Sequence, residues 1–454
     1  MKNRFDFSKI RGTQFWRQPH IGRRVFFRHM ASAVGGYFLL PSRPLETIAK
    51  ASVTPIGTAK NCIFILLTGA PSHTDTFDLK EGSWTPGYFN PTSFGDIRFP
   101  QGLMPKIAAQ LDSIALVRSV RAWATAHGLA QTWVQIGRNP ASGLSKIAPH
   151  IGSVVSLELG PASPDHTLPP FISLNASDGP SQGYLTPDNA PFYVSPSGGG
   201  LGNTAHPGGV DVFNRRYGIK LDLDTELESD PLLGTQLDPA FVANESARKV
   251  MYNPAVDAVF NFDTATRASY GTSSFGNACI AARNLLRANL GTRFIQISFG
   301  SWDHHVNIYA PNANLQSMAK QFDNGLGQLL ADLKQDGTLD QTLIVALGEF
   351  GRTVGALNTT NGRDHHVQQT ALFAGAKVTG KSVIGATDAT GGTIVDPGWS
   401  RQREVRPEDL EATIYSALGI DWTTVRHDDP LQRGFEYVPF SDQDLYGPVN
   451  ELWG

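Results

Sequence analysis

Three strand-like segments rich in apolar residues, at 61–67, 293–299 and 342–347, stand out in the pattern of hydrophobic and polar positions along the chain. The segment at 342–347 is a continuous apolar run, which is typical of a parallel strand that is buried on both faces. Each of the three leads into a segment that contains carboxylate, hydroxyl or imidazole side chains. Because ligands bind at the carboxyl ends of the strands in open α/β sheets, the pattern predicts a functional site at that edge.

Helical periodicity separates these strands. The clearest amphipathic helix is predicted at residues 313–335, where Leu315, Phe322 and Leu326 belong to one apolar stripe. Further helices are predicted at 103–112, 125–138, 275–290 and 406–418, and short strands at 114–117 and 370–373. This alternation predicts a doubly wound, mostly parallel α/β sheet with helices on both faces.

Residues 160–209 interrupt the alternation because they are rich in Pro, Gly and Ser. They predict a loop-rich segment that either forms a lid over the site or lies on the surface. Residues 210–270 are predicted as mixed helical sequence. We therefore expect a single α/β domain at 52–454 with a loop-rich insertion at about 160–270.

The first 51 residues resemble a twin-arginine export signal. Arg23 and Arg24 precede an aromatic pair and an apolar stretch at 31–40, and residues 49–51 give a small-x-small cleavage pattern. The stretch is shorter than the ~20 residues that span a bilayer, so no stable transmembrane helix is expected. The expectation is export by the twin-arginine machinery to the periplasm or the medium; the alternative is an ordinary basic amphipathic N-terminus.

Composition excludes some partners. The 38 basic and 41 acidic side chains nearly balance, which argues against nucleic acid or an anionic membrane as a partner. The two cysteines, Cys62 and Cys279, have no zinc-ligand spacing and lie in apolar contexts, so they are predicted to be buried free thiols.

The segment after the third apolar run carries the clearest metal-binding pattern. Glu349 follows the run directly, and Asp364, His365 and His366 come one loop later. Carboxylate oxygens and imidazole nitrogens side by side are typical ligands of divalent cations. Arg352 lies in the same stretch.

The other two strand ends add similar residues. Asp75 and Asp78 follow the first run, where either could bind a metal while the other braces the loop, although Asp is also an ordinary turn residue. Asp303 and His305 follow the second run. His127 is expected near the N-terminus of the helix at 125–138, where it either helps to hold an anion or only caps the helix. Three such clusters at corresponding strand ends predict one shared site.

Together these motifs resemble the bacterial domain-of-unknown-function family fifteen-oh-one, which is similar to the alkaline phosphatase and sulfatase superfamily. The resemblance rests on residues 69–78, 302–305, 348–353, 362–366 and 409–418, and it covers most of residues 60–420. It implies an alkaline phosphatase/sulfatase-like fold with one or two divalent metal ions (Zn, Mn, Ca or Mg) at the strand ends. It also implies a phosphate or sulfate ester of a small molecule or glycan as substrate.

By position, the resemblance implies a ligand set drawn from all three strand ends. The implied metal ligands are Asp75 or Asp78, Asp303, His305, Glu349, Asp364, and His365 or His366. Arg352 and Arg363 lie beside these ligands, and two guanidinium groups near a metal are expected to meet an anion. With His127 they form the predicted catalytic set. A metal-free cluster of structural ion pairs is the third interpretation.

Three departures from the superfamily pattern keep two functions open. Phe350 stands where a histidine ligand is usual, and the spacing of Asp303 and His305 is short. His127 falls where the resemblance places a modified cysteine, so Thr125 and Ser72 are the nearest hydroxyl nucleophiles. The leading prediction is an exported metal-dependent hydrolase. The alternative is a non-catalytic exported metal-binding protein with a role in binding or cell-surface assembly.

Overall fold

A computed structural model describes residues 53–160, 166–176, 179–228 and 238–454. Its centre is an eight-stranded sheet with the order β12-β4-β11-β8-β1-β7-β5-β6. Every neighbouring pair is parallel except the two pairs that involve β11. The strands are β1 (Asn61–Leu66), β4 (Ile114–Arg121), β5 (Phe171–Leu174), β6 (Phe192–Val194), β7 (Phe294–Ser298), β8 (Thr342–Leu347), β11 (Gln368–Gly375) and β12 (Ser382–Ile384).

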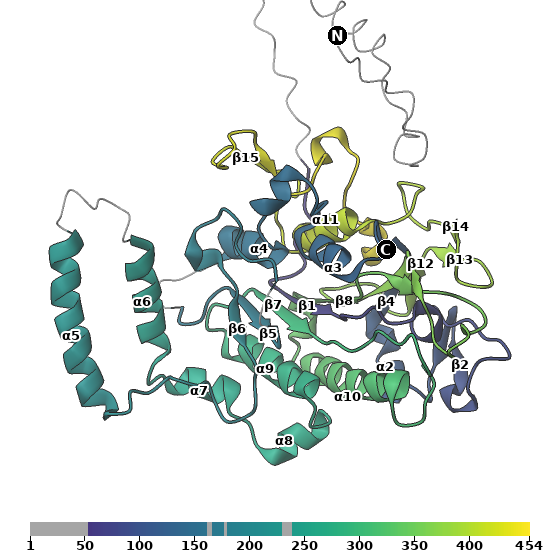
Figure 1. Cartoon of the computed structure of the whole chain (residues 1–454), viewed down its shortest axis with the longest axis horizontal. Helices are drawn as coiled ribbons and strands as arrows, with labels where there is room; N and C mark the ends of the chain where they lie inside the picture. Colours follow the sequence, from purple (N-terminus) through teal and green to yellow (C-terminus); the bar gives the residue numbers. More distant parts are fainter. Residues whose placement is uncertain (1–52, 161–165, 177–178, 229–237) are drawn as a thin grey trace, which may run out of the picture. The chain divides into compact units, whose positions relative to one another are not determined.

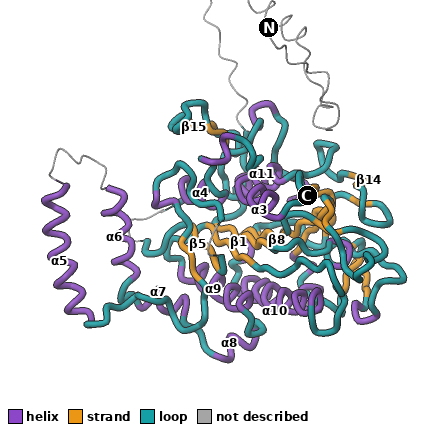
Figure 2. The backbone as a smooth tube through the Cα atoms, in the orientation of Figure 1, coloured by secondary structure: helices purple, strands orange, loops and turns teal. Residues whose placement is uncertain are grey.

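Helices cover both faces of this sheet (Figures 1 and 2). One layer contains α2 (Pro105–Ala108), α9 (Ser274–Ala288) and α10 (Asn314–Gln335), and the other contains α3 (His127–Ile136), α4 (Ile151–Leu159) and α11 (Pro407–Ala417). Alternate residues of β1 point to opposite faces of the sheet. Ile63 and Ile65 pack against the first helix layer, and Phe64 and Leu66 pack against the second. The doubly wound α/β prediction is therefore confirmed.

The remaining elements lie around the sheet. The helices α5 (Gly209–Glu228), α6 (Asp238–Val250), α7 (Pro254–Phe260) and α8 (Thr264–Ser269) follow β6. Four two-stranded ribbons pair β2 (Pro91–Phe94) with β3 (Ile97–Pro100), β9 (Gly351–Arg352) with β10 (His365–His366), β13 (Ala386–Thr387) with β14 (Ile394–Asp396), and β15 (Val425–Arg426) with β16 (Phe435–Glu436). Among the described residues, no helix combines the length and apolar character needed to cross a membrane.

Local sequence signals set several helix ends. The Ser273 side chain caps α9 by accepting the Gly276 N–H at 3.0 Å, and Asn289 ends it in the left-handed conformation. Gly137 ends α3 with φ +56°, and a Cβ there would fall onto the carboxylate of Glu411. Only glycine satisfies both demands at that position.

The structure differs from the sequence-based predictions at three places. Residues 160–209, predicted as a loop-rich insertion, contribute β5 and β6 to the central sheet. Pro170 and Pro191 directly precede these strands, so the proline-rich composition marks their starts. The helix predicted at 103–112 is only the short α2, followed by a 3₁₀ turn. β11 runs antiparallel, a direction that an apolar run alone does not encode.

The prediction for the two cysteines is confirmed. Cys62 in β1 and Cys279 in α9 are buried free thiols, and burial raises the pKa of both. Neither thiol is available as a nucleophile at the strand ends.

Candidate metal centre

Three segments bring imidazole and carboxylate groups together at the carboxyl edge of the sheet. His127 is the first residue of α3, which follows β4, and Asp303 and His305 lie in the loop after β7. His365 lies on β10, whose antiparallel partner β9 follows β8. The predicted meeting of strand ends at this edge is therefore found, and the Asp303, His127, His305 and His365 cluster is called the strand-end cluster below.

The ligand atoms of the strand-end cluster are spaced like the corners of a coordination shell. The Nε2 atom of His365 lies 3.1 Å from that of His127 and 3.0 Å from that of His305. The Asp303 carboxylate oxygens lie 2.9 Å, 3.4 Å and 3.6 Å from the same three nitrogens of His305, His127 and His365. A tetrahedral ion with ligands at ~2.0–2.1 Å would hold neighbouring ligand atoms about 3.3 Å apart.

The second nitrogen of each histidine has an acceptor that fixes the ring. Nδ1 of His127 donates to Glu349 Oε1 at 2.7 Å, and Nδ1 of His305 donates to Asp364 Oδ1 at 2.8 Å. Nδ1 of His365 donates to the Thr125 carbonyl at 2.7 Å. In the neutral rings the protons therefore sit on Nδ1, and three Nε2 lone pairs face one another. A cation between them removes that repulsion, which is the hydrogen-bonding pattern of metal-bound histidines.

Charge near the cluster favours its metal-binding protonation state. Burial and the positive charge of Arg352 lower the pKa of His365. Burial alone raises the pKa of Asp303, but the Arg352 hydrogen bond and charge outweigh it, so the pKa lies below its usual value. The hydrogen bond from His305 likewise lowers the pKa of Asp364. A neutral imidazole and two carboxylates are the forms that bind cations.

Glu349 is fully buried behind His127. Its Oε1 accepts from the Gly69 N–H at 2.9 Å and from Gln131 Nε2 at 3.1 Å, in addition to His127. Its Oε2 is buried without a hydrogen-bond partner. An orphaned oxygen on the carboxylate that fixes the His127 ring is a second observation that fits a cation at this edge.

Arg352 provides a fixed positive charge at the base of the cluster. It is buried, and its five N–H groups reach the carbonyls of Gly69, Ala70 and Arg363, the Asp303 carboxylate and His305 Nε2. Gly69 is required here because a Cβ would lie 2.8 Å from the backbone nitrogens of Trp302 and Asp303. The sequence proposed Arg352 as an anion-binding group, whereas the structure uses all of its donors within the protein.

Asp75 and Arg363 lie outside the strand-end cluster. They form a buried two-bond ion pair, with Arg363 Nε 2.6 Å and Nη2 3.0 Å from the carboxylate oxygens, and Tyr309 donates to Asp75 at 2.8 Å. The remaining Arg363 donors reach the Thr353 and Gly355 carbonyls and the Tyr309 hydroxyl. In the structure Asp75 thus neutralises a buried arginine, and the roles of Asp75 as a ligand and of Arg363 as an anion-binding residue stay predictions.

Asp78 and His366 also face elsewhere. Asp78 is buried and paired with Arg118 at 3.1 Å and Lys80 at 3.2 Å. His366 stacks on buried His73, and its Nδ1 accepts the Gln368 N–H at 3.1 Å. Adjacent residues on a strand point to opposite sides, so only one of the two neighbouring histidines joins the cluster.

The two predicted hydroxyl nucleophiles take other roles. Thr125 gives its carbonyl to His365, and buried Ser72 places its hydroxyl 3.4 Å from that of Thr74. Gln131, one helical turn after His127, was missed by the sequence analysis, although the i, i+4 spacing could have indicated that it shares the His127 face. The Thr125 carbonyl accepts a hydrogen bond from His365, and the sequence could not indicate this because every residue has a backbone carbonyl.

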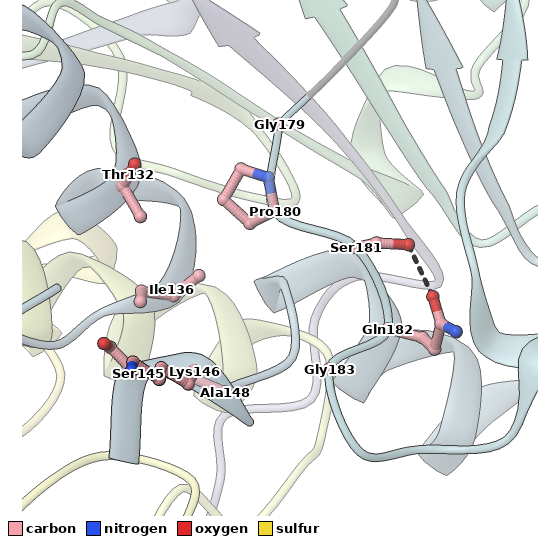
Figure 3. A pocket seen from close by; sticks show the side chains of 10 residues that line it. All are labelled: Thr132, Ile136, Ser145, Lys146, Ala148, Gly179, Pro180, Ser181, Gln182 and Gly183. Atoms are coloured by element: carbon pink, nitrogen blue, oxygen red, sulfur yellow. Dashed lines mark hydrogen bonds between the residues drawn. The ribbon is translucent and has the colours of Figure 1, made fainter. Parts of the chain in front are cut away.

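A separate cavity of about 380 Å³ lies along α3 (Figure 3). Thr132 and Ile136 of α3, the segment around Ser145 and Lys146, and residues 179–183 line it. Because Thr132 is five residues after His127, the cavity begins roughly 7 Å along the helix from the cluster. It contains none of the cluster residues.

Comparisons with known proteins give one family match. The model of the family described as "Protein of unknown function (DUF1501)" matches residues 59–436. No curated protein matches the chain significantly.

Solved structures give remote matches. The structure of Ps i-CgsB with k-i-k-neocarrahexaose matches with a TM-score of 0.40 at 14% identity, covering 87% of this chain and 77% of that chain. The PsFucS1 sulfatase from Pseudoalteromonas sp. matches with a TM-score of 0.39 at 12% identity, covering 82% and 69%. An alkaline phosphatase superfamily protein from Vibrio parahaemolyticus matches with a TM-score of 0.39 at 12% identity, covering 87% and 76%.

Proposed function

The chain belongs to the DUF1501 family, and from its strand-end cluster we propose that it is an exported metal-dependent hydrolase of a phosphate or sulfate ester. The observation that carries the proposal is the convergence of three Nε2 atoms and one carboxylate, with every Nδ1 bonded to an acceptor. The cluster is also open. The side chains of His127 and Asp303 are 31% and 43% exposed, whereas structural metal sites are closed.

His127, His365 and Asp303 would hold a divalent cation, because one ligand atom from each lies within 4.8 Å of the others. His305 lies beside this set, but its Nε2 accepts from Arg352 Nη1 at 3.2 Å, so it would join the ligands only by releasing that hydrogen bond. A bound divalent cation supplies charge neutralisation at the ester and activation of a nucleophile. Zinc suits the imidazole-rich donor set best among the ions that the sequence analysis considered.

The residues of the chain have separable tasks in this proposal. Glu349 and Asp364 keep the protons of His127 and His305 on Nδ1 and so aim both Nε2 atoms into the site. Arg352 orients the Asp303 carboxylate at 2.6 Å and adds a fixed positive charge beneath it. The first-turn N–H groups of α3 have no side-chain cap, and the helix dipole there attracts an anionic ester.

The leaving group of the ester has room along α3. Gly128 follows His127, is exposed, and leaves open space where a side chain would stand. The cavity at Thr132 and Ile136 continues in the same direction along the helix. A small-molecule or glycan ester is the substrate class that this surface supports.

A second candidate function is metal binding without catalysis, in a binding or cell-surface assembly role. The observation that favours it is the saturation of Arg352 and Arg363, whose N–H groups all have partners within the protein. An anionic ester would therefore depend on the cation and the α3 N-terminus for its positive surroundings.

One experiment separates the two functions. The purified protein is analysed for bound metals and then assayed with p-nitrophenyl phosphate, bis(p-nitrophenyl) phosphate and p-nitrophenyl sulfate with Zn, Mn, Mg or Ca. The hydrolase predicts about one or two metal equivalents and turnover of at least one ester that His365→Ala abolishes. Bound metal without turnover of any ester would favour the binding role, and the absence of both would contradict the metal site.

A further inference from the structure

The cavity along α3 has walls that are fixed to the fold. Thr132 and Ile136 of α3 lie on one side, and Pro180 faces them from the segment at 179–183 in Figure 3. Two backbone hydrogen bonds of 2.8 and 3.0 Å fasten residues 181–184 to residues 147–150, so this wall does not depend on side-chain packing alone. The volume of about 380 Å³ is in the range of small-molecule binding sites.

The lining offers positive charge and free hydrogen-bond donors. Lys146 is the one charged residue that lines the cavity, and none of the lining residues is acidic. Lys146 is exposed, and no carboxylate in the described part of the chain pairs with it. The backbone N–H groups of Ser181, Gln182 and Gly183 likewise have no acceptor among the described residues. Unpaired donors without a neighbouring acid favour an anionic ligand.

The rest of the lining suits a hydroxylated ring. Ile136, Ala148 and Pro180 provide aliphatic contacts for the C–H face of a sugar. The hydroxyl groups of Thr132 and Ser145 donate to backbone carbonyls at 2.8 and 2.7 Å, so their oxygen lone pairs remain for the O–H groups of a ligand. Together with the free donors, these groups match an anionic sugar.

A stripe of α3 connects the strand-end cluster with the cavity. Gly128, Thr132 and Ile136 are spaced by four residues, so they lie on one face of the helix. Gly128 follows His127, and a Cβ there would meet no atom within 4 Å. A ligand held at His127 can therefore pass over Gly128 and reach the cavity, which begins roughly 7 Å along the helix.

We propose that the cavity binds a sugar residue with an anionic substituent, and that Lys146 and the N–H groups at 181–183 hold its sulfate, phosphate or carboxylate. That this residue is part of the ester substrate rests on the proposed function. The substrate is then a sugar or glycan with two anionic groups, one at the ester that meets the cation and one in the cavity. Lys146 selects for the second group, because a neutral hydroxyl in its place forms no charge-assisted hydrogen bond between opposite charges.

A matched ligand series tests the cavity. Glucose, glucuronate, glucose 6-sulfate and glucose 6-phosphate share one ring and differ in the substituent at a single carbon. Titration of the full chain, followed by ligand-observed NMR, is expected to show at least one anionic sugar binding about tenfold or more tightly than glucose. The sugar that binds most tightly identifies the substituent. Affinities of all three anionic sugars equal to that of glucose would overturn the proposal.

Variants of the cavity lining locate the bound sugar. Lys146→Ala is expected to weaken binding of the anionic sugar by about tenfold or more, and Lys146→Arg is expected to retain most of it. Lys60→Ala changes an exposed lysine elsewhere and is the matched control. Thr132→Phe fills the cavity and is expected to abolish binding. Circular dichroism verifies the fold of each variant, and equal effects of Lys146→Ala and Lys60→Ala would contradict the cavity site.

His365→Ala separates this proposal from the hydrolase. It is expected to leave sugar binding in place, because the cavity contains no residue of the strand-end cluster. Binding that is lost in His365→Ala but kept in Lys146→Ala would place the sugar at the metal centre and overturn the cavity site. If the wild type holds no metal yet binds the sugar through Lys146, the proposed hydrolase fails and the cavity site stands.

Discussion

The Nε2 atoms of His127 and His365 lie 3.1 Å apart, although the other nitrogen of each ring donates to an acceptor. Because the proton of each neutral ring is on Nδ1, both Nε2 atoms carry a lone pair. Neither Nε2 can donate a hydrogen bond to the other. They come from segments 238 residues apart in the sequence. A cation that both nitrogens bind is the simplest way to stabilise this arrangement, and the first prediction follows from it.

Removal of the metal is expected to destabilise the wild type but not the His365→Ala variant. A ligand that binds only the folded state at 100 times its Kd contributes about 2.7 kcal/mol. Thermal unfolding with and without EDTA, together with elemental analysis, measures the effect. His427→Ala, which changes an exposed histidine, is the control and is expected to behave as wild type. Equal metal content in wild type and His365→Ala would contradict the site.

Asp364→Ala is expected to weaken metal binding by about 10–100-fold, because His305 loses the carboxylate that fixes its ring. The fold is expected to be retained, since the Asp364 side chain is 56% exposed. Metal titration followed by calorimetry measures the change in affinity. Asp96→Ala alters an exposed aspartate elsewhere and is the matched control; an equal loss in both variants would refute the orienting role.

Asp75→Ala is expected to destabilise the protein by about 3–5 kcal/mol, because it leaves the Arg363 charge buried without a partner. Urea unfolding of the metal-free protein gives the free energy of unfolding. Glu81→Ala breaks the exposed pair with Arg98 and is expected to cost less than about 1 kcal/mol. If Asp75→Ala instead lost metal and kept its stability, the ligand role that the sequence predicted would be restored.

Stability is expected to fall as pH rises through neutrality because of two buried acids on α11. Burial raises the pKa of Glu408 to about 7 and that of Glu411 to about 8. Between the unfolded-state pKa near 4.5 and these values the folded state holds more protons, so the free energy of unfolding decreases by up to about 1.4 kcal/mol per pH unit and group.

Glu411→Gln mimics the protonated acid and is expected to flatten the pH profile between pH 5 and 8. Thermal unfolding across this range measures it. Glu81→Gln serves as the control, because the pKa of Glu81 is lowered by Arg98 and its linkage acts at lower pH. A profile of Glu411→Gln that parallels the wild type would show that the carboxylate is already charged in the fold.

Replacement of Arg23 and Arg24 by lysine is expected to stop export, because the twin-arginine machinery reads the arginine pair. Cell fractionation of a bacterial host with an intact twin-arginine system measures the exported fraction. Lys2→Arg changes a distant basic residue and is expected to leave export unchanged. Export of the double lysine variant at the wild-type level would favour the alternative of an ordinary basic N-terminus, provided that the wild type is exported.

The sequence by itself determined the elements with strong periodicity. The apolar runs that became β1, β7 and β8 and the amphipathic pattern of α10 were predicted because burial on both faces, or on one stripe, leaves a direct mark on residue order. It also indicated the edge of the sheet at which Asp303, His305 and His365 meet, since polar residues follow β7 and β8. The short strands β5 and β6 left no such mark within a segment rich in Pro and Gly.

Only the tertiary structure decided which of these candidates share a site. His365 faces the strand-end cluster and His366 does not, because neighbouring strand residues point to opposite sides. Asp75 meets Arg363 across 288 residues, so the same two groups that look like a metal ligand and an anion clamp in sequence neutralise each other in space. Pairing of charges depends on distance in three dimensions, and the order of residues along a chain does not contain that distance.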